Sequence, residues 1–341
     1  MKNQSVRTIC CNPSVYENFT KPNTLEFNNS LNTKDCLLKG EFPQYKRDCI
    51  SPCNMALLSI MSKLYHVPIE NCLLANSGVA LATMLSLSNR FNRILVFKST
   101  YCEMVSAYNS NNKVITFDEN FTDFQNNDLV CFESIAVPEC IQYDYAKIVK
   151  RAKNAKAFVC IDNTIKTWYR TTLKQYDPDF IIESMSKFGN GLNSSLIGFI
   201  YSKDTNFLGN LCYLKQVLGF YAHEFDIYLT LCNIQTMPLR LDQIKKTSIK
   251  VEDLLNTFDL RYASYSDSGI FLFDIPENMT NTDVANLFSS FNVIKSADTF
   301  GAPFTAASFW QSLHKIRISV GLEEFNDLVD DIVKLSKALS T

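Results

Sequence analysis

The chain has 341 residues, of which 46% are apolar, and its 33 Lys and Arg nearly balance its 35 Asp and Glu. This length is sufficient for one large domain and one smaller domain, each with its own core. The near-neutral charge argues against nucleic acids and acidic membranes as partners, so we expect a small-molecule ligand.

The first 50 residues are polar, rich in Asn and without sustained periodicity. A segment of this kind needs a partner surface to become ordered. We therefore expect residues 1–55 to form an arm that contacts a neighbouring subunit. Neither this segment nor any later one has an apolar run long enough for a signal peptide or a membrane span, which predicts a cytoplasmic protein.

Short apolar runs alternate with helical stretches from about residue 70 onward. This alternation predicts βαβ units and a mostly parallel sheet in a large domain over residues 56–236. Asp144 is placed to cap a crossover helix whose apolar residues recur at helical spacing, namely Tyr145, Ile148, Val149 and Ala152. The predicted strands are residues 72–75, 93–97, 113–117, 128–132, 157–161, 180–182 and 195–201.

The pattern changes beyond residue 236 and predicts a smaller α+β domain over residues 237–341. The predicted fold class is thus α/β, with a mostly parallel sheet in the large domain. The elements expected in the small domain are a helix at 243–258, a strand at 270–275, a helix at 283–291, a strand at 315–320 and a final amphipathic helix on Phe325, Leu328, Val329 and Ile332.

The 12 cysteines are scattered along the chain, many of them inside apolar runs as at Cys160. We interpret them as reduced thiols that pack as small hydrophobic groups. Cys49 and Cys53 are the only close pair with metal-like spacing, and no second Cys or His pair stands at a finger-like distance from them. The sequence therefore predicts no metal site.

Polar residues at the ends of three predicted strands are the candidates for chemistry. Ligands of an open parallel sheet bind beyond the carboxyl ends of its strands. Asp162 ends one run, Lys187 follows another, and Ser77 follows a third directly before a helix. Each has an ordinary explanation, because a loop Lys is usually solvated, an Asp often caps a turn, and Ser-Gly is often only an N-cap. Together they predict one site.

A carbonyl cofactor that bonds covalently to a lysine needs that lysine out of bulk water and a carboxylate opposite its pyridine nitrogen. Lys187 and Asp162 supply these two groups. A phosphate on the same cofactor needs hydroxyl groups and the N–H groups of a helix N-terminus. The residues available for it are Ser184, Ser186 and the turn of Ser77, Gly78 and Val79.

The same segments resemble those of a known family. The chain has Asp-Asn-Thr at 162–164 and Ser-x-Ser-Lys-Phe-x-x-Gly from Ser184, with 25 positions between Asp162 and Lys187. These segments are similar to Asp-Asn-Thr and Ser-x-Thr-Lys-Tyr-x-x-Gly of the Cys/Met-metabolism PLP-dependent enzymes. Ser-Gly-Val-Ala at 77–80 resembles the family's phosphate turn, and Phe-Glu-Ser at 132–134 matches its Glu-Thr/Ser-Pro strand end. The resemblance implies the fold type I PLP-dependent transferase fold, pyridoxal 5'-phosphate on Lys187, Thr164 among the cofactor-binding residues, and Tyr101 stacked on the cofactor.

A further segment near the C-terminus extends the resemblance. Ile-Arg-Ile-Ser-Val-Gly-Leu-Glu at 316–323 is similar to a family segment whose arginine binds the substrate carboxylate, which makes Arg317 the expected anchor. An arginine fork suits a carboxylate because two parallel charge-assisted bonds fix its orientation. Residues 297–301 resemble Glu-Ser-Leu-Gly-Gly of γ-acting members. Asp298 then stands where a glutamate meets the distal amino group or leaving group, with Thr299 beside it, although a surface loop acid is an equal reading.

In the arm, Tyr45-Lys46-Arg47 resembles the Tyr-Ser-Arg segment that reaches across a dimer to the neighbour's cofactor phosphate. The resemblance therefore implies a homodimer or homotetramer with shared active sites, in which Tyr45 and Arg47 bind the neighbour's cofactor. Tyr45 is also a candidate to activate the incoming amine or the leaving group, which places it with Lys187 and Tyr101 as the expected catalytic residues.

The implied activity is elimination or replacement at the γ or β carbon of a sulfur- or oxygen-substituted amino acid. This is the chemistry of C–S lyases and γ-replacement transferases of the cystathionine γ-synthase and γ-lyase type, which act in transsulfuration. The alternative is a catalytically inactive protein of the same fold that serves as a binding or regulatory partner. Val137, where the family has Asn, and Leu192, where it has His, motivate this alternative; the presence of Lys187, Asp162 and Arg317 argues against it.

Overall fold

A computed structural model describes residues 51–111, 114–137, 139–171 and 173–340. Tyr45, Arg47 and all but the last positions of the expected arm lie outside the described residues. Helix α4 (Pro52–Tyr65) begins at Pro52, with the Ser51 side chain accepting a hydrogen bond from the Asn54 amide. In the described part of the chain, no helix combines the length and the apolar content needed to cross a lipid bilayer.

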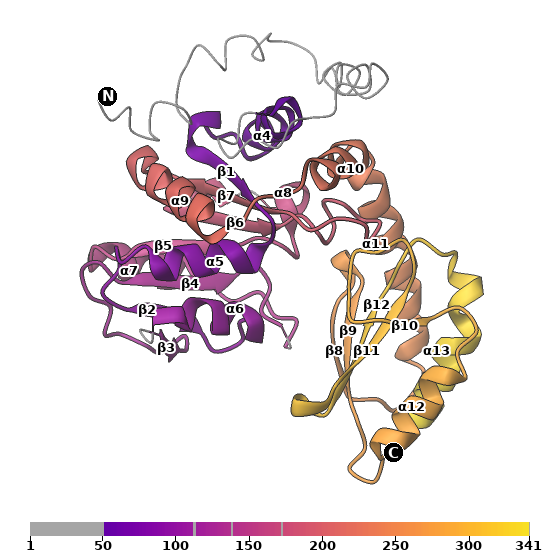
Figure 1. Ribbon diagram of the computed structural model, residues 1–341. Helices are drawn as coiled ribbons and strands as arrows, with labels where there is room; N and C mark the ends of the chain where they lie inside the picture. The colour runs from indigo at the N-terminus through magenta and orange to yellow at the C-terminus, as the bar shows by residue number, and fades with distance from the viewer. Residues whose placement is uncertain (1–50, 112–113, 138, 172, 341) are drawn as a thin grey trace, which may run out of the picture.

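Seven strands form the larger sheet, in the order β1-β7-β6-β5-β4-β2-β3 (Figure 1). The pairings among β2 to β6 are parallel, whereas β7 runs antiparallel to both β1 and β6. The sheet is therefore mostly parallel, as predicted. Its strands are β1 (Cys72–Ala75), β2 (Ile94–Phe97), β3 (Val114–Phe117), β4 (Leu129–Glu133), β5 (Phe158–Asp162), β6 (Phe180–Ser184) and β7 (Gly198–Ser202).

Helices cover both faces of this sheet, which explains why its strands read as continuous apolar runs. One face packs against α5, α6 and α9, and the other packs against α7 and, beside β1 and β7, against α4 and α10. Cys131 and Cys160 lie inside the first of these layers. The helices are α5 (Gly78–Leu87), α6 (Cys102–Tyr108), α7 (Tyr145–Asn154), α8 (Thr167–Arg170), α9 (Thr205–Leu218) and α10 (Glu224–Ile234).

The predicted crossover helix is α7, and its start corrects one detail of the prediction. Tyr145, Ile148, Val149 and Ala152 are all buried, as their spacing indicates. Asp144 occupies the N-cap position, but its side chain makes no capping hydrogen bond. Its backbone (φ −74°, ψ 79°) departs from the extended conformation that aims an N-cap side chain at the first helical N–H groups. The expected Asp144 cap is therefore wrong.

Five strands form the second sheet, in the order β10-β11-β12-β9-β8, and all its pairings except β10 with β11 are antiparallel. Helices α11, α12 and α13 pack against one face of this sheet. The predicted strands at 270–275 and 315–320 are β9 and β12. The elements of this part are α11 (Met237–Leu255), β8 (Tyr262–Tyr265), β9 (Ile270–Asp274), α12 (Asn281–Ser289), β10 (Lys295–Ser296), β11 (Ala306–Trp310), β12 (Lys315–Ser319) and α13 (Phe325–Leu339).

The other face of the second sheet meets the loops that follow β4 and β5. Ile270 and Leu272 of β9 pack there against Ile135, Cys140 and Ile165 in one buried apolar cluster. This contact places the second sheet over the carboxyl ends of the parallel strands, the edge where an open α/β sheet binds its ligands.

Candidate active site

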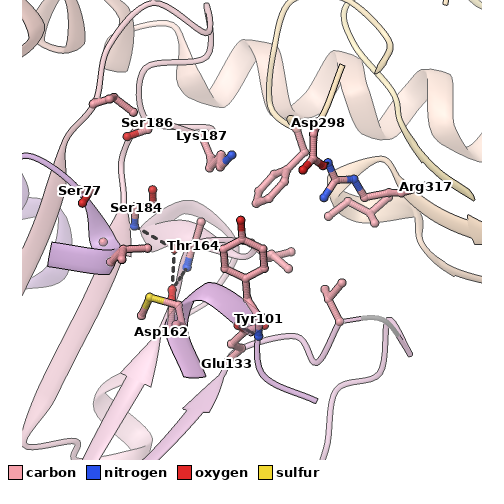
Figure 2. A pocket seen from close by; sticks show the side chains of 18 of the residues that line it. Ser77, Tyr101, Glu133, Asp162, Thr164, Ser184, Ser186, Lys187, Asp298 and Arg317 are labelled. Carbon is pink, nitrogen blue, oxygen red and sulfur yellow. Dashed lines mark hydrogen bonds and ion pairs between the residues drawn. The ribbon is translucent and has the colours of Figure 1, made fainter. Parts of the chain in front are cut away.

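A cavity of about 220 Å³ lies at this edge, between the two sheets. Figure 2 shows its polar side chains converging from both sides of the opening. Except for the two arm residues, which lie outside the described residues, and Thr299, the predicted site residues all line it. They are Ser77, Gly78, Val79, Tyr101, Asp162, Thr164, Ser184, Ser186, Lys187, Asp298 and Arg317.

Asp162 stands at the floor of the cavity as the last residue of β5. Its Oδ1 accepts hydrogen bonds from the amide (2.9 Å) and the hydroxyl of Thr164, and that hydroxyl accepts one from the Ser184 amide at 2.8 Å. Thr164 thus joins the ends of β5 and β6 (Figure 2). Burial raises the pKa of Asp162, and no Lys or Arg of the described residues forms an ion pair with it. A half-buried carboxylate with no cationic partner among the described residues fits a protonated pyridine nitrogen.

Glu133, the last residue of β4, is a buried acid of the cavity that the sequence did not single out as a site residue. It pairs in register with Asp162 on the neighbouring strand. Burial raises its pKa, and the charge of Asp162 adds to this rise. Its Oε1 accepts a hydrogen bond from the Tyr101 amide at 2.8 Å. Glu133 therefore fixes the backbone of Tyr101, whose ring projects into the cavity (Figure 2).

Ser77 and the start of α5 form the turn that the sequence predicts for an anion. The Ser77 hydroxyl accepts a hydrogen bond from the Ala80 amide at 3.0 Å. The N–H groups of Gly78 and Val79 stand in the first turn of α5, where the helix itself offers no acceptor. Gly198 of β7 makes this arrangement possible, because a Cβ atom there would lie 2.3 Å from the Ser77 carbonyl oxygen. No local signal in the sequence marks Gly198, since the contact joins distant segments.

The two serines expected at the phosphate differ in their surroundings. The Ser186 hydroxyl accepts a hydrogen bond from the Ile197 amide at 2.9 Å and lies 3.3 Å from the Ile197 carbonyl oxygen. Ser184 lies directly against α5, and a Cβ atom at Gly78 would be 3.2 Å from the Ser184 Cβ. Because its hydroxyl has no hydrogen-bond partner within the described residues, Ser184 is the better placed donor for an anion at the turn.

Lys187 lies on the loop after β6, and the side chain of the buried Arg240 binds the backbone of this loop. Arg240 donates hydrogen bonds to the carbonyl oxygens of Phe188 and Asn233, both at 3.0 Å. The Lys187 Nζ lies 5.0 Å from the ring centroid of Phe300. Burial lowers the pKa of Lys187, and the positive charge of Arg317 lowers it further. The amine therefore loses its proton more readily than a solvated lysine does.

Arg317 on β12 faces Lys187 across the cavity and is only 5% exposed. Its Nη2 donates to Asp298 Oδ1 at 2.8 Å and to the carbonyl oxygen of Thr299 at 3.2 Å. Thr299 itself does not line the cavity; its hydroxyl donates to Asn193 Oδ1 at 3.2 Å. The guanidinium group thus has a fixed position at the cavity wall, where it is able to bind a carboxylate.

A comparison of the amino-acid sequence with protein families identifies the family of the chain. The family described as "Cys/Met metabolism PLP-dependent enzyme" matches residues 14–267 of the 341-residue chain, which is well over half of its length. The chain belongs to this family. The predicted family and the predicted fold class are therefore confirmed, and the family is one of PLP-dependent enzymes.

Relatives of this family share modest sequence identity with the chain. It is 24% identical over 245 residues to cystathionine beta-lyase of Mimosa pudica, a match that covers 62% of this chain and 53% of that protein. It is 23% identical over 210 residues to cystathionine gamma-synthase of Escherichia coli, with the same two coverages. The chain thus spans about half the length of the curated relatives it matches.

Solved structures show the same fold over most of the chain. Cystathionine gamma synthase from Xanthomonas oryzae pv. oryzae in complex with cystathionine superposes with a TM-score of 0.74 at 17% identity, covering 86% of this chain and 88% of that one. Cystathionine gamma-lyase from Lactobacillus plantarum complexed with L-serine gives a TM-score of 0.73 at 17% identity, covering 87% and 89%. At this identity the likeness establishes the fold.

Proposed function

We propose that the chain binds pyridoxal phosphate on Lys187 and catalyses elimination or replacement at the γ or β carbon of a sulfur- or oxygen-substituted amino acid. The observation that carries this proposal is that Lys187 and Asp162 line the same cavity. Lys187 is partly withdrawn from water, and Asp162 is a half-buried carboxylate whose pKa is raised and which forms no ion pair with a Lys or Arg of the described residues. In a PLP-dependent family, these two groups suit the covalent bond and the ring nitrogen of the cofactor.

Different residues around the cavity would bind different parts of the cofactor. Asp162, oriented by Thr164, would hold a proton at the pyridine nitrogen. The Ser77 turn and the Ser184 hydroxyl would bind the phosphate, with the N-terminal dipole of α5 favouring its charge. The ring of Tyr101 would pack on the cofactor ring, because its backbone is fixed by Glu133.

Catalysis follows from the same groups. When bound, pyridoxal phosphate supplies an electron sink that acidifies the Cα–H bond of an attached amino acid. The amine of Lys187, once released, would take that proton and return it at a neighbouring carbon, which its lowered pKa favours. Arg317 would bind the α-carboxylate and so orient the Cα–H bond toward Lys187.

Three further proposals concern the assembly, the domain boundaries and the location of the protein in the cell. Tyr45 and Arg47, outside the described residues, would complete the site of a neighbouring subunit in a homodimer or homotetramer. We also propose a division into an arm (1–55), a PLP-binding domain (56–236) and a small domain (237–341), the last of which starts where α11 begins. A cytoplasmic location stays a prediction.

The test is product analysis with purified protein and its Lys187→Ala variant. Each is saturated with pyridoxal phosphate and incubated with cystathionine, methionine, cysteine, or O-acylhomoserine together with cysteine as the nucleophile. Cleavage of cystathionine to cysteine, 2-oxobutanoate and ammonia indicates action at the γ carbon, whereas homocysteine, pyruvate and ammonia indicate the β carbon. The proposal requires turnover of at least one of these amino acids by the wild type and none by the variant. If neither protein turns over any of them while both fold, the binding-partner alternative gains support.

A further inference from the structure

The anion-binding arginine of the cavity is already engaged by an acid of the same chain. Arg317 Nη2 donates to Asp298 Oδ1 at 2.8 Å. Figure 2 shows the Asp298 carboxylate pointing at the guanidinium group, on the side of the cavity away from Asp162. A carboxylate is the group that an amino-acid substrate would bring to Arg317, so the side chain of Asp298 lies where the substrate's own carboxylate has to bind.

The two partners of this ion pair differ sharply in their freedom to move. The Arg317 side chain is 6% exposed and the Asp298 side chain is 70% exposed. The guanidinium group also lies 5.0 Å from the Trp310 ring and 5.7 Å from the Phe300 ring, and it donates to the Thr299 carbonyl oxygen. Arg317 is thus held in place without Asp298. The exposed carboxylate is free to leave, because an ion pair with one solvated partner is weak.

The backbone that carries Asp298 is itself anchored, so the side chain is the part that moves. Thr299 is 6% exposed, and its hydroxyl donates to Asn193 Oδ1. Gly301 has φ +72°, and a Cβ atom there would lie 3.0 Å from the carbonyl carbon of Lys187. These contacts hold the segment against the Lys187 loop. Rotation of the Asp298 side chain toward solvent therefore needs no movement of the site around it.

Arg317 also has binding capacity that its present partners leave unused. Its Nε is buried and has no hydrogen-bond partner within the described residues. A carboxylate that binds a guanidinium group in the two-bond mode uses two neighbouring N–H groups, whereas the hydrogen bond to Asp298 uses Nη2 alone. A ligand able to reach a second N–H group would outcompete Asp298 at this position.

We propose that Asp298 is a displaceable internal occupant of the carboxylate site on Arg317, which admits a carboxylate ligand only when that ligand takes its place. This inference rests on the proposed role of Arg317 as the substrate anchor and assigns to Asp298 a role in selecting ligands. Small carboxylates that bind through the carboxylate alone compete poorly with Asp298. Amino acids that are also held elsewhere in the cavity displace it.

The position of Trp310 beside Arg317 supplies a direct readout of this site. The chain has two tryptophans, Trp168 and Trp310. In a Trp168→Phe background the tryptophan fluorescence comes from Trp310, and its change on adding ligand is the measured response. Propionate, a carboxylate without an amino group, is titrated into the full chain as purified at constant ionic strength, with propionamide as the neutral control. Asp298→Asn and Asp298→Ala are compared with the background. Asp330→Asn, which removes an exposed acid on α13, on the face of the second sheet away from the cavity, is the matched control for net charge.

Both Asp298 variants are expected to bind propionate about two- to fivefold more tightly than the background, the range that the loss of a partly exposed ion pair allows. Asp330→Asn is expected to change the affinity less than about twofold, because distant surface charges are screened. Arg317→Gln combined with Asp298→Asn is expected to abolish the response. The inference is overturned if the Asp298 variants bind propionate equally or more weakly than the background. It is also overturned if propionamide gives an equal response, if the response survives loss of Arg317, or if none of the proteins responds. The covalent cofactor on Lys187 is measured separately and does not depend on these outcomes.

Discussion

Glu183 on β6 is a buried carboxyl group whose ionisation couples folding to pH. Its Oε2 accepts a hydrogen bond from the Tyr65 hydroxyl, which in turn accepts one from Asn163 Nδ2 at 3.0 Å. Its Oε1 has no hydrogen-bond partner within the described residues. Burial raises the pKa of Glu183 to about 8; the hydrogen bond from Tyr65 opposes this rise and the charge of Asp162 adds to it.

The size of the effect follows from the two pKa values. The ordinary value for glutamate is 4.5 and the folded value is about 8. Between these pH values the folded protein keeps a proton that the unfolded chain releases. The stability that this group contributes is therefore complete below pH 4.5 and is lost as the pH rises through 8. The loss is about 1.4 kcal/mol per pH unit, or at most about 5 kcal/mol in total.

The variant Glu183→Gln removes the titration and keeps an acceptor for the Tyr65 hydroxyl. Urea unfolding of both proteins is measured at pH 5, 6.5 and 8, at equal concentration and cofactor content. The free energy of unfolding of the variant, relative to wild type, is expected to rise by up to about 4 kcal/mol from pH 5 to pH 8. Glu277→Gln, at an exposed position, is the control. A difference that stays constant over this range, or falls, refutes the reasoning.

Three other perturbations test the site. Gly198→Ala places a methyl group 2.3 Å from the Ser77 carbonyl oxygen, so the dissociation constant of pyridoxal phosphate should rise by about tenfold or more in equilibrium dialysis; an unchanged constant contradicts the role of the turn. Arg240→Met removes the donors to the Phe188 and Asn233 carbonyl oxygens and should lower the free energy of unfolding by about 2–3 kcal/mol in urea, whereas no loss would show that these bonds contribute nothing. Tyr101→Phe should bind the cofactor as tightly as wild type and Tyr101→Ala about five- to tenfold more weakly, and equal affinity of the two variants contradicts stacking.

The parts of the site that the sequence predicts are those with a local signal. Asp162, Lys187 and Ser77 each follow a short apolar run, and the carboxyl ends of strands in a parallel sheet meet at one edge. Their convergence on one cavity therefore follows from the strand pattern alone. The Arg317 segment carries its signal in the family-like sequence around it rather than in periodicity.

The parts that the sequence does not predict depend on contacts between distant segments. Gly198 is needed only because the Ser77 turn lies against it, and Arg240 matters because the Lys187 loop packs on it. Strands β8 and β11 lack a clear apolar alternation: all four residues of β8 are half-buried, and β11 begins with two alanines. The ion pair between Arg317 and Asp298 is likewise set by tertiary packing, and no spacing in the sequence indicates it.

The proposed covalent bond between the cofactor and Lys187 can be trapped chemically and located in the sequence. The purified chain is incubated with pyridoxal phosphate, reduced with borohydride, digested and examined by mass spectrometry, beside Lys187→Ala. We expect a phosphopyridoxyl group on the peptide that contains Lys187 and no specific modification of the variant. A modification spread over surface lysines in both proteins, or none on the Lys187 peptide, would contradict this expectation.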